Sequence, residues 1–187
     1  MNHSTCAFIG QRPSQFPWGY DEEATDCILL KLALYNQLEH FIQNGVDEFI
    51  TGLTLGADLW CAELVLALKK RYPHCKLTCA LASETQASRW SPIDRERYYQ
   101  VLEQCDLAFF LYHHHSSHCI PICNRFRIDR SDFLLAVYDG KANGSIHHMI
   151  EYAKLTKKNM VQIHPATRKK EFHISGAYCK DQPSTFS

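Results

Sequence analysis

Short apolar runs alternate with longer helical segments along most of this chain, and this alternation limits the possible folds more than any other feature. The runs are apolar throughout, as in strands that are buried on both faces of a sheet. No hairpin turn joins consecutive runs. The predicted strands are Cys6–Ile9, Glu48–Thr51, Lys76–Ala82, Leu107–Leu111, Phe133–Tyr138 and Met160–Ile163.

The segments between these runs carry apolar residues at helical spacing. Gly45 follows the first segment as a stop signal, and Ser91-Pro92 supplies an N-cap and a first-turn proline for the third. The predicted helices are Asp21–Asn44, Ala57–Tyr72, Ile93–Gln104, a short Asn124–Asp129 and Ser145–Thr156.

Strands that alternate with helices form parallel sheets with right-handed crossovers and helices on both faces. The sequence therefore predicts an α/β fold: a Rossmann-like three-layer α/β/α domain with a mainly parallel sheet of about five to six strands. A length of 187 residues, 45% of them hydrophobic, favours one domain. We expect that domain to span residues 1–165, followed by a loose, partly basic C-terminal tail at 166–187 that either docks on the domain or stays mobile.

The charge balance gives no sign of a polyanionic partner. Lys plus Arg and Asp plus Glu both number 20, so no global field attracts nucleic acid or an anionic membrane. A basic groove interleaved with aromatic residues is also missing from the pattern. The expected partner is a small nucleotide-type ligand, with no nucleic acid and no membrane.

Targeting signals are missing from the sequence. The N-terminus does not resemble a signal peptide, and no apolar run reaches the length of about 18 residues that a membrane helix needs. Nine cysteines, an odd number scattered through apolar stretches, are expected to be reduced thiols. These features predict a cytoplasmic protein.

The segment His113–Cys119, with Cys123 beyond it, raises a zinc hypothesis because imidazole and thiolate are zinc ligands. The spacing matches no standard structural zinc pattern. We therefore expect no metal site.

Three predicted strands end in glycine-containing turns, which should meet at one edge of the sheet: Gly10–Pro13, Gly52–Gly56 and Asp139–Gly144. Ligands of open α/β sheets bind at this edge. Glycine permits close backbone approach, and a following helix N-terminus offers free amides to an anion. Purely conformational roles explain any one turn equally well. The expected phosphate-binding residues are Gly10, Gly52, Gly56, Asp139, Gly140, Gly144 and Ser145.

Polar side chains near these turns complete the candidate site. Arg12 follows the first strand, where a guanidinium can bind phosphate in bidentate fashion. Asp58 and Glu63 belong to the second helix, where a carboxylate binds ribose hydroxyls or only complements the helix dipole. Asn124 and Arg125 precede the fifth strand and are expected to contact the base or a second phosphate, unless they serve only in capping and turns.

Taken as an ordered set, these residues resemble the YpsA-like family of the SLOG superfamily, whose wider kin include the LOG phosphoribohydrolases and the DNA-processing protein DprA. The resemblance extends over most of residues 6–163. It is carried by Gly10-Gln11-Arg12-Pro13 with Trp18-Gly19; Gly52 with Gly56-Ala57-Asp58 and Glu63; Arg97-Tyr98; Asn124-Arg125; and Asp132 with Tyr138-Asp139-Gly140, Asn143-Gly144-Ser145 and Tyr152-Ala153.

The resemblance implies a Rossmann-like domain that binds ADP-ribose, NAD-related metabolites or a nucleoside phosphate, linked in some bacterial members to cell division or stress. Two positions depart from the family: Gln11 replaces a common histidine, and Asn143-Gly144-Ser145 replaces Gly-Gly-Thr. Serine keeps the hydroxyl, and asparagine tolerates positive φ. The LOG catalytic glutamate aligns with His148, which argues against LOG chemistry.

Three hypotheses of function follow. The first is a binding or sensing protein, in which a nucleotide changes association with an unknown protein partner. The second is an N-glycoside hydrolase or phosphoribohydrolase, with Glu63 or Asp58 as its catalytic carboxylate. The third is a scaffold without a ligand. Apolar surface on the outer helices also leaves a homodimer open.

Overall fold

A computed structural model describes residues 3–113, 119–142 and 144–175. Its core is one sheet of seven strands in the order β4-β3-β2-β1-β5-β6-β7. Strands β1 to β6 pair in parallel, and β7 pairs antiparallel with β6. The strands are β1 (Thr5–Gly10), β2 (Glu48–Thr51), β3 (Lys76–Ser83), β4 (Leu107–Tyr112), β5 (Phe133–Val137), β6 (Asn159–Ile163) and β7 (Lys170–His173).

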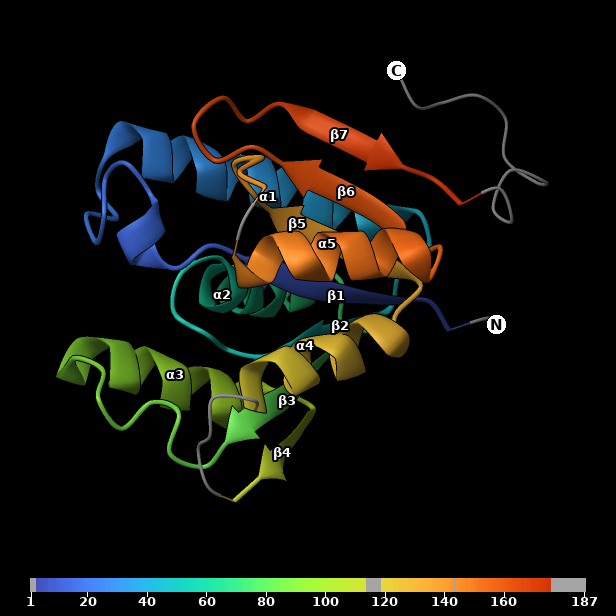
Figure 1. Ribbon diagram of the computed structural model, residues 1–187. Helices are drawn as coiled ribbons and strands as arrows, with labels where there is room; N and C mark the ends of the chain where they lie inside the picture. Colours follow the sequence, from blue (N-terminus) through green and yellow to red (C-terminus); the bar gives the residue numbers. More distant parts are fainter. Residues whose placement is uncertain (1–2, 114–118, 143, 176–187) are drawn as a thin grey trace.

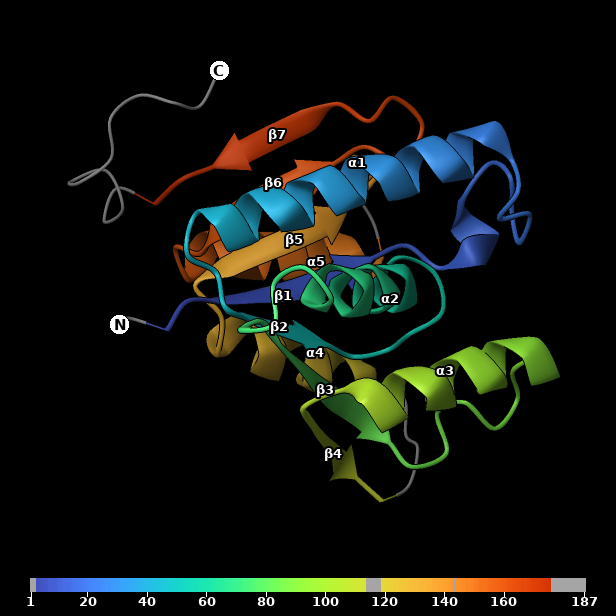
Figure 2. The same ribbon diagram turned by 180° about the vertical axis from the view of Figure 1, so that it is seen from behind.

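Helices cover both faces of this sheet. Figure 1 shows α4 and α5 on one face, and Figure 2 shows α1, α2 and α3 on the other. The predicted three-layer α/β/α architecture is confirmed. The helices are the 3-10 turn η1 (Pro13–Gln15), α1 (Thr25–Gln43), α2 (Ala57–Lys69), α3 (Pro92–Gln104), α4 (Cys119–Asp129) and α5 (Ser145–Leu155).

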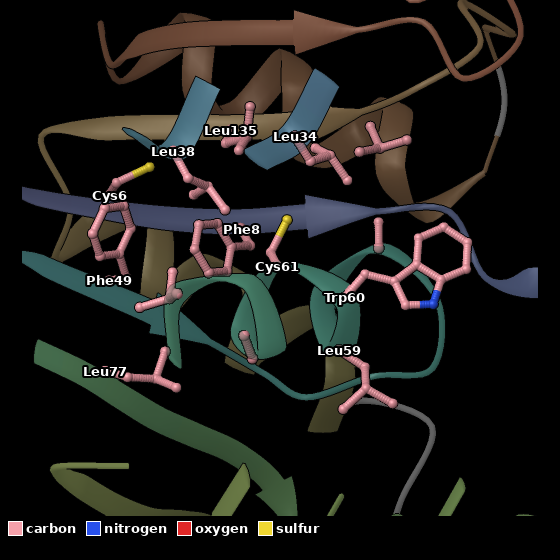
Figure 3. Packing of buried hydrophobic residues seen from close by; sticks show 14 of the residues in the cluster. Cys6, Phe8, Leu34, Leu38, Phe49, Leu59, Trp60, Cys61, Leu77 and Leu135 are labelled. Atoms are coloured by element: carbon pink, nitrogen blue, oxygen red, sulfur yellow. The ribbon is translucent and has the colours of Figure 1, made fainter. Parts of the chain in front are cut away.

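The larger part of the hydrophobic core lies between the sheet and helices α1 and α2. Figure 3 shows Leu34 and Leu38 of α1 next to Phe8 of β1, with Cys61 of α2 on the same face. The rings of Phe8 and Phe49 stack with their centroids 5.8 Å apart. This packing holds β1 and β2 rigidly under α2, and both strands end at the candidate site.

Strand β7 corrects the expectation of a loose tail from Pro165 onward, at least for Lys170–His173, and brings the sheet to seven strands. The sequence Lys-Glu-Phe-His has no apolar run because β7 is an edge strand with half-exposed or exposed residues. The domain boundary expected at 165 therefore falls between two strands of one sheet.

Helix α4 begins at Cys119, five residues before the predicted start at Asn124. Pro121 marks this stretch as a loop in the sequence, yet a proline in the first turn of a helix costs no hydrogen bond. Cys119 and Cys123 are buried and pack against Ala82. The extra turn brings Ile120 to the edge of the candidate site.

Candidate ligand-binding site

The loop after β1 is anchored to helix α2 by stacked aromatic rings. The ring of Phe16 lies between those of Trp18 and Trp60, at centroid distances of 4.9 Å and 5.2 Å. The backbone amide of Ala57 donates to the carbonyl of Gln11. The loop thereby holds Arg12 just beyond β1, where its side chain is exposed and forms no ion pair with any residue in the described ranges.

A small pocket of about 40 Å³ lies at the carboxyl ends of the central strands. This is the edge where the topology of an open α/β sheet places ligands. Five residues expected from the sequence line the pocket, namely Gly10, Arg12, Asp58, Asn124 and Ser145. Its other polar lining residues are Gln15, Thr54 and Arg127.

A buried ion pair forms the floor of this pocket. An Nη atom of Arg127 lies 3.0 Å from Oδ2 of Asp58, and both side chains are 2% exposed. The same guanidinium donates to the carbonyl of Phe8 at 2.8 Å and to the side-chain oxygen of Asn124. Burial raises the pKa of Asp58, while the charge of Arg127 acts in the opposite direction.

The Nε atom of Arg127 is buried and has no hydrogen-bond partner within the described part of the chain. Such an unpaired buried donor is costly, on the order of 1–3 kcal/mol.

A larger cleft of about 780 Å³ adjoins the small pocket. Both are lined by Arg12, Thr54 and Ile120, so they form neighbouring parts of one site. Most of the other lining residues come from the β1–α1 loop and from the segment between β3 and α3. They include Tyr20, Arg89 and Trp90, and helix α3 adds Asp94 and Arg97.

The glycines of the first two turns serve internal packing. A Cβ atom on Gly10 would lie 2.3 Å from Cβ of Ala57, and one on Gly52 would lie 2.8 Å from Cζ of Arg127. Gly56 combines a φ of +96° with a similar clash against the carbonyl of Gln11. The close contacts of these glycines therefore shape the site, and Gly10 also lines the small pocket.

The turn before α5 differs, because a Cβ atom on Gly140 or Gly144 would meet nothing within 4 Å. Both glycines adopt positive φ, +84° and +92°. The N-cap residue of α5 is Gly144, which has no side chain to cap the helix, and the helix begins at Ser145 on the wall of the small pocket. An uncapped helix start carries free amides and the positive end of the helix dipole.

Glu63 and Arg125 lie away from the pocket and the cleft, and neither lining includes Gly52, Gly56 or Gly144. Glu63 accepts hydrogen bonds from Arg97 at 2.7 and 2.8 Å, on the side of α2 that faces α3. Arg125 is exposed, and its guanidinium lies over the ring of Tyr152. The structure thus separates both residues from the other candidates.

Asp139 and Gly140 also stand outside the lining residues. The carboxylate of Asp139 pairs with Lys141 at 2.9 Å and accepts the Lys141 amide. This short-range turn gives the segment before α5 its shape.

Sequence reasoning missed Arg127, which contacts Phe8, Asp58 and Asn124 at the small pocket. The signal was the spacing of Asn124 and Arg127, which at i and i+3 share one face of a helix. Arg125 points to another face of the same helix. A predicted helix that starts at Asn124 leaves too little of α4 to recognise this face.

Metal binding has little support among the residues that the structure covers, where no group of three or more His, Cys, Asp or Glu side chains is placed to hold an ion. Residues 114–118 of the histidine-rich segment lie outside the described ranges. The eight cysteines described are all free thiols. Within the same ranges, no helix has the length and apolar character needed to cross a membrane.

Solved structures of DprA share this fold. The X-ray structure of DprA from Streptococcus pneumoniae superposes with a TM-score of 0.59 at 11% identity, over 86% of this chain and 50% of that one. DprA from Helicobacter pylori gives a TM-score of 0.57 at 17% identity, over 86% of this chain and 65% of that one. The chain thus spans less than two thirds of either protein.

The Helicobacter pylori structure concerns the single-stranded DNA binding mode of that protein. The expectation that nucleic acid is no partner is therefore wrong as an exclusion, since the same fold accommodates such a ligand. The error was physical as well: a net charge of zero excludes a global field but leaves room for local arginines such as Arg12 and Arg89.

Sequence comparisons identify the family. A UPF0398 protein of Bacillus cereus strain B4264 is 34% identical over 136 residues, which are 72% of this chain and 73% of the relative. A UPF0398 protein of Bacillus thuringiensis strain Al Hakam matches to the same extent. The model of the YpsA family, described as the YspA SLOG family, matches residues 6–170. The resemblance seen in the sequence is confirmed, and the chain belongs to the YpsA family of SLOG proteins.

Proposed function

We propose that the protein binds a nucleotide-type ligand with a phosphate in the small pocket and the rest of the molecule in the adjoining cleft. One observation carries this proposal: Arg12, which forms no ion pair within the described ranges, the buried Arg127 and the N-terminus of α5 at Ser145 all line one pocket. Arginine and a helix N-terminus are the groups that proteins use most directly to bind phosphate.

The sizes of the two spaces fit this division. A pocket of about 40 Å³ accepts a group of a few atoms, such as a phosphoryl group. The cleft of about 780 Å³ lies within the usual range for small-molecule sites, roughly 300–1,000 Å³. ADP-ribose, NAD and simple nucleoside phosphates are the free ligands that we propose as candidates.

The contacts of Glu63 and Asp58, the two candidate catalytic carboxylates, favour a binding or sensing role over hydrolysis. Glu63 is engaged by Arg97 outside the cleft, and Asp58 is held by Arg127 beneath the pocket. Neither carboxylate has the freedom to position a water against an N-glycosidic bond. The hydrolase therefore remains the second hypothesis, and detection of product would establish it. The free thiols support a cytoplasmic setting for either role.

The same chemistry also suits the terminal nucleotide of a single strand. The likeness to DprA makes this second kind of ligand worth testing. Both sources present a phosphate, a sugar and a base. A strand would in addition gain affinity from phosphates beyond the site and depend strongly on salt. The experiment must therefore compare the two.

Isothermal titration calorimetry with AMP, ADP-ribose, NAD, ribose 5-phosphate and a 5′-phosphorylated oligothymidylate tests this proposal. Arg12→Ala should weaken every phosphate ligand about tenfold or more, because a charge-assisted hydrogen bond is lost. Arg125→Ala is the matched control and should leave affinity unchanged, since Arg125 lies outside the site.

Chromatography of the solution in the calorimeter cell, after each titration, separates the outcomes. Intact ligand identifies a binding protein, and free base or ribose phosphate identifies a hydrolase. Tight, salt-dependent binding of the oligonucleotide alone would make single-stranded nucleic acid the ligand. Absence of heat with all five ligands would overturn the proposal.

A further inference from the structure

Aromatic and apolar side chains line the part of the cleft beyond the small pocket. Tyr20 is 67% exposed and Ile93 is 72% exposed, although both are large hydrophobic residues. Trp90, three residues before Ile93, also lines the cleft and is half-buried. Exposed apolar groups gathered at one concave site are typical of a binding surface.

The indole of Trp90 is held in place from behind. It packs edge-to-face against the buried ring of Tyr98, with the centroids 5.5 Å apart and an interplanar angle of 83°. The backbone amide of Trp90 donates to the carbonyl of Ala87. A ring fixed in this way loses little side-chain entropy when a planar ligand stacks on it.

Arg89 and Asp94 are two of the charged residues that line the cleft with Trp90. Arg89 is exposed and forms no ion pair with other residues of the described ranges. Asp94 accepts the hydroxyl proton of Ser91 at 2.7 Å and lies 3.7 Å from Arg97. Its carboxylate retains acceptor capacity, and ribose hydroxyls are donors that suit such a group.

The geometry points to a nucleoside subsite in the cleft, with the base stacked on Trp90 and the ribose beside Asp94. This inference rests on the proposed function, which puts the phosphate next to Arg12 in the small pocket. Arg12 lines both spaces, so one ligand can occupy them together. The ligand class is a complete nucleotide unit, either free or at the end of a single strand, and a sugar phosphate alone fills only half of the site.

The test compares AMP with ribose 5-phosphate, which differs from it by the base. Wild-type protein should bind AMP about tenfold more tightly or better, as expected for one base stacked on an aromatic ring. Trp90→Ala should reduce AMP affinity to that of ribose 5-phosphate and leave the latter unchanged. Trp90→Phe should keep most of the AMP affinity.

Tyr99→Ala is a matched control, because Tyr99 also packs edge-to-face on Tyr98 but is absent from the lining of the cleft. It should change neither affinity. Arg12→Ala should weaken AMP and ribose 5-phosphate alike. If Arg12→Ala leaves both affinities unchanged, the result counts against the proposed function. Equal affinity of the wild-type protein for the two ligands overturns only the nucleoside subsite.

Tryptophan fluorescence provides a second readout, which does not require replacing the large side chain of Trp90 by alanine. The chain has three tryptophans, and AMP should quench part of their emission while ribose 5-phosphate does not. This quenching should disappear in Trp90→Phe. Quenching that persists in Trp90→Phe would assign the effect to Trp18 or Trp60 and overturn the role of Trp90. A 5′-phosphorylated oligoadenylate in parallel distinguishes a strand end from a free nucleotide.

Discussion

At the residue scale, a glycine, which has no side chain, determines how closely helix α2 approaches strand β1. Gly10 ends β1 directly against Ala57, the first residue of α2. From the sequence alone, Gly10 is expected to let a phosphate approach the backbone. The structure gives it a packing role as well, and the two roles make different predictions.

Gly10→Ala should destabilise the fold by about 1–3 kcal/mol, because the new Cβ atom overlaps that of Ala57. Ala57→Gly in the same chain should recover more than half of this loss. Urea denaturation of the wild-type protein, both single variants and the double variant measures the coupling. An unchanged midpoint in Gly10→Ala would show that this contact does not limit the packing.

The contrast between Arg125 and Arg127 also belongs to the residue scale. Two positions apart on α4, one arginine is exposed over Tyr152 and the other is buried against Asp58. An α-helix has 3.6 residues per turn, so the side chains at i and i+2 lie on different faces of the helix. Which of them lies at the site depends on how α4 packs on the sheet.

At the element scale, Arg97 connects three segments around the cleft. From helix α3 it donates to Glu22 in the β1–α1 loop at 2.8 and 3.2 Å and to Glu63 on α2. Glu22 also accepts hydrogen bonds from Lys31 and from the indole of Trp60. The loop that carries Arg12 is thereby tied to helices α1, α2 and α3.

This network predicts a pH dependence of stability. Burial alone would raise the pKa of Glu22, but hydrogen bonds from Arg97, Lys31 and Trp60 lower it from 4.5 to about 2. A lowered pKa in the folded state means that the stabilisation is complete above pH 4.5 and is lost as the pH falls toward 2.

Urea denaturation between pH 6 and pH 2, roughly the range that brackets the shift, measures this contribution. The stability difference between wild-type protein and Glu22→Gln should shrink as the pH falls. Glu103→Gln is the control, since Glu103 is exposed on α3 and has no ion pair in the ranges described. A difference between wild type and Glu22→Gln that stays constant with pH would refute the role of the Glu22 charge.

At the scale of the whole molecule, β7 closes the sheet beside β6. Lys170 donates to the side chain of Gln37 on α1, and the amide of Ser175 donates to the side chain of Asn159. These contacts tie the C-terminal segment to both the helix layer and the sheet. Without β7, the mostly buried strand β6 would become an unprotected edge.

Removal of residues 166–187 should lower Tm by about 5 °C or more, given that 1 kcal/mol corresponds to roughly 2–4 °C for a domain of this size. Calorimetry and light scattering should show lower stability and more self-association. Lys170→Ala removes one side-chain contact and should have a much smaller effect. A truncated chain as stable as the full one would restore the expectation of a loose tail.

Much of the fold follows from local patterns that the sequence itself determines. Continuous apolar runs become strands buried on both faces, and helical spacing between them leaves a parallel sheet as the consistent solution. The strand ends then share one edge, so the positions of Gly10, Arg12, Asn124 and Ser145 near one site could be predicted. Strand β7 could not, because a polar edge strand lacks a burial pattern.

The identity of the contacts within the site was decided only by the tertiary structure. Asp58 and Arg127 are 69 residues apart in the chain, yet their ion pair is the floor of the small pocket. Whether a glycine faces a ligand or a neighbouring helix likewise depends on packing distances of a few ångström. Periodicity along the chain reports which side of an element is buried, whereas the partner it is buried against is set by the long-range arrangement of the layers.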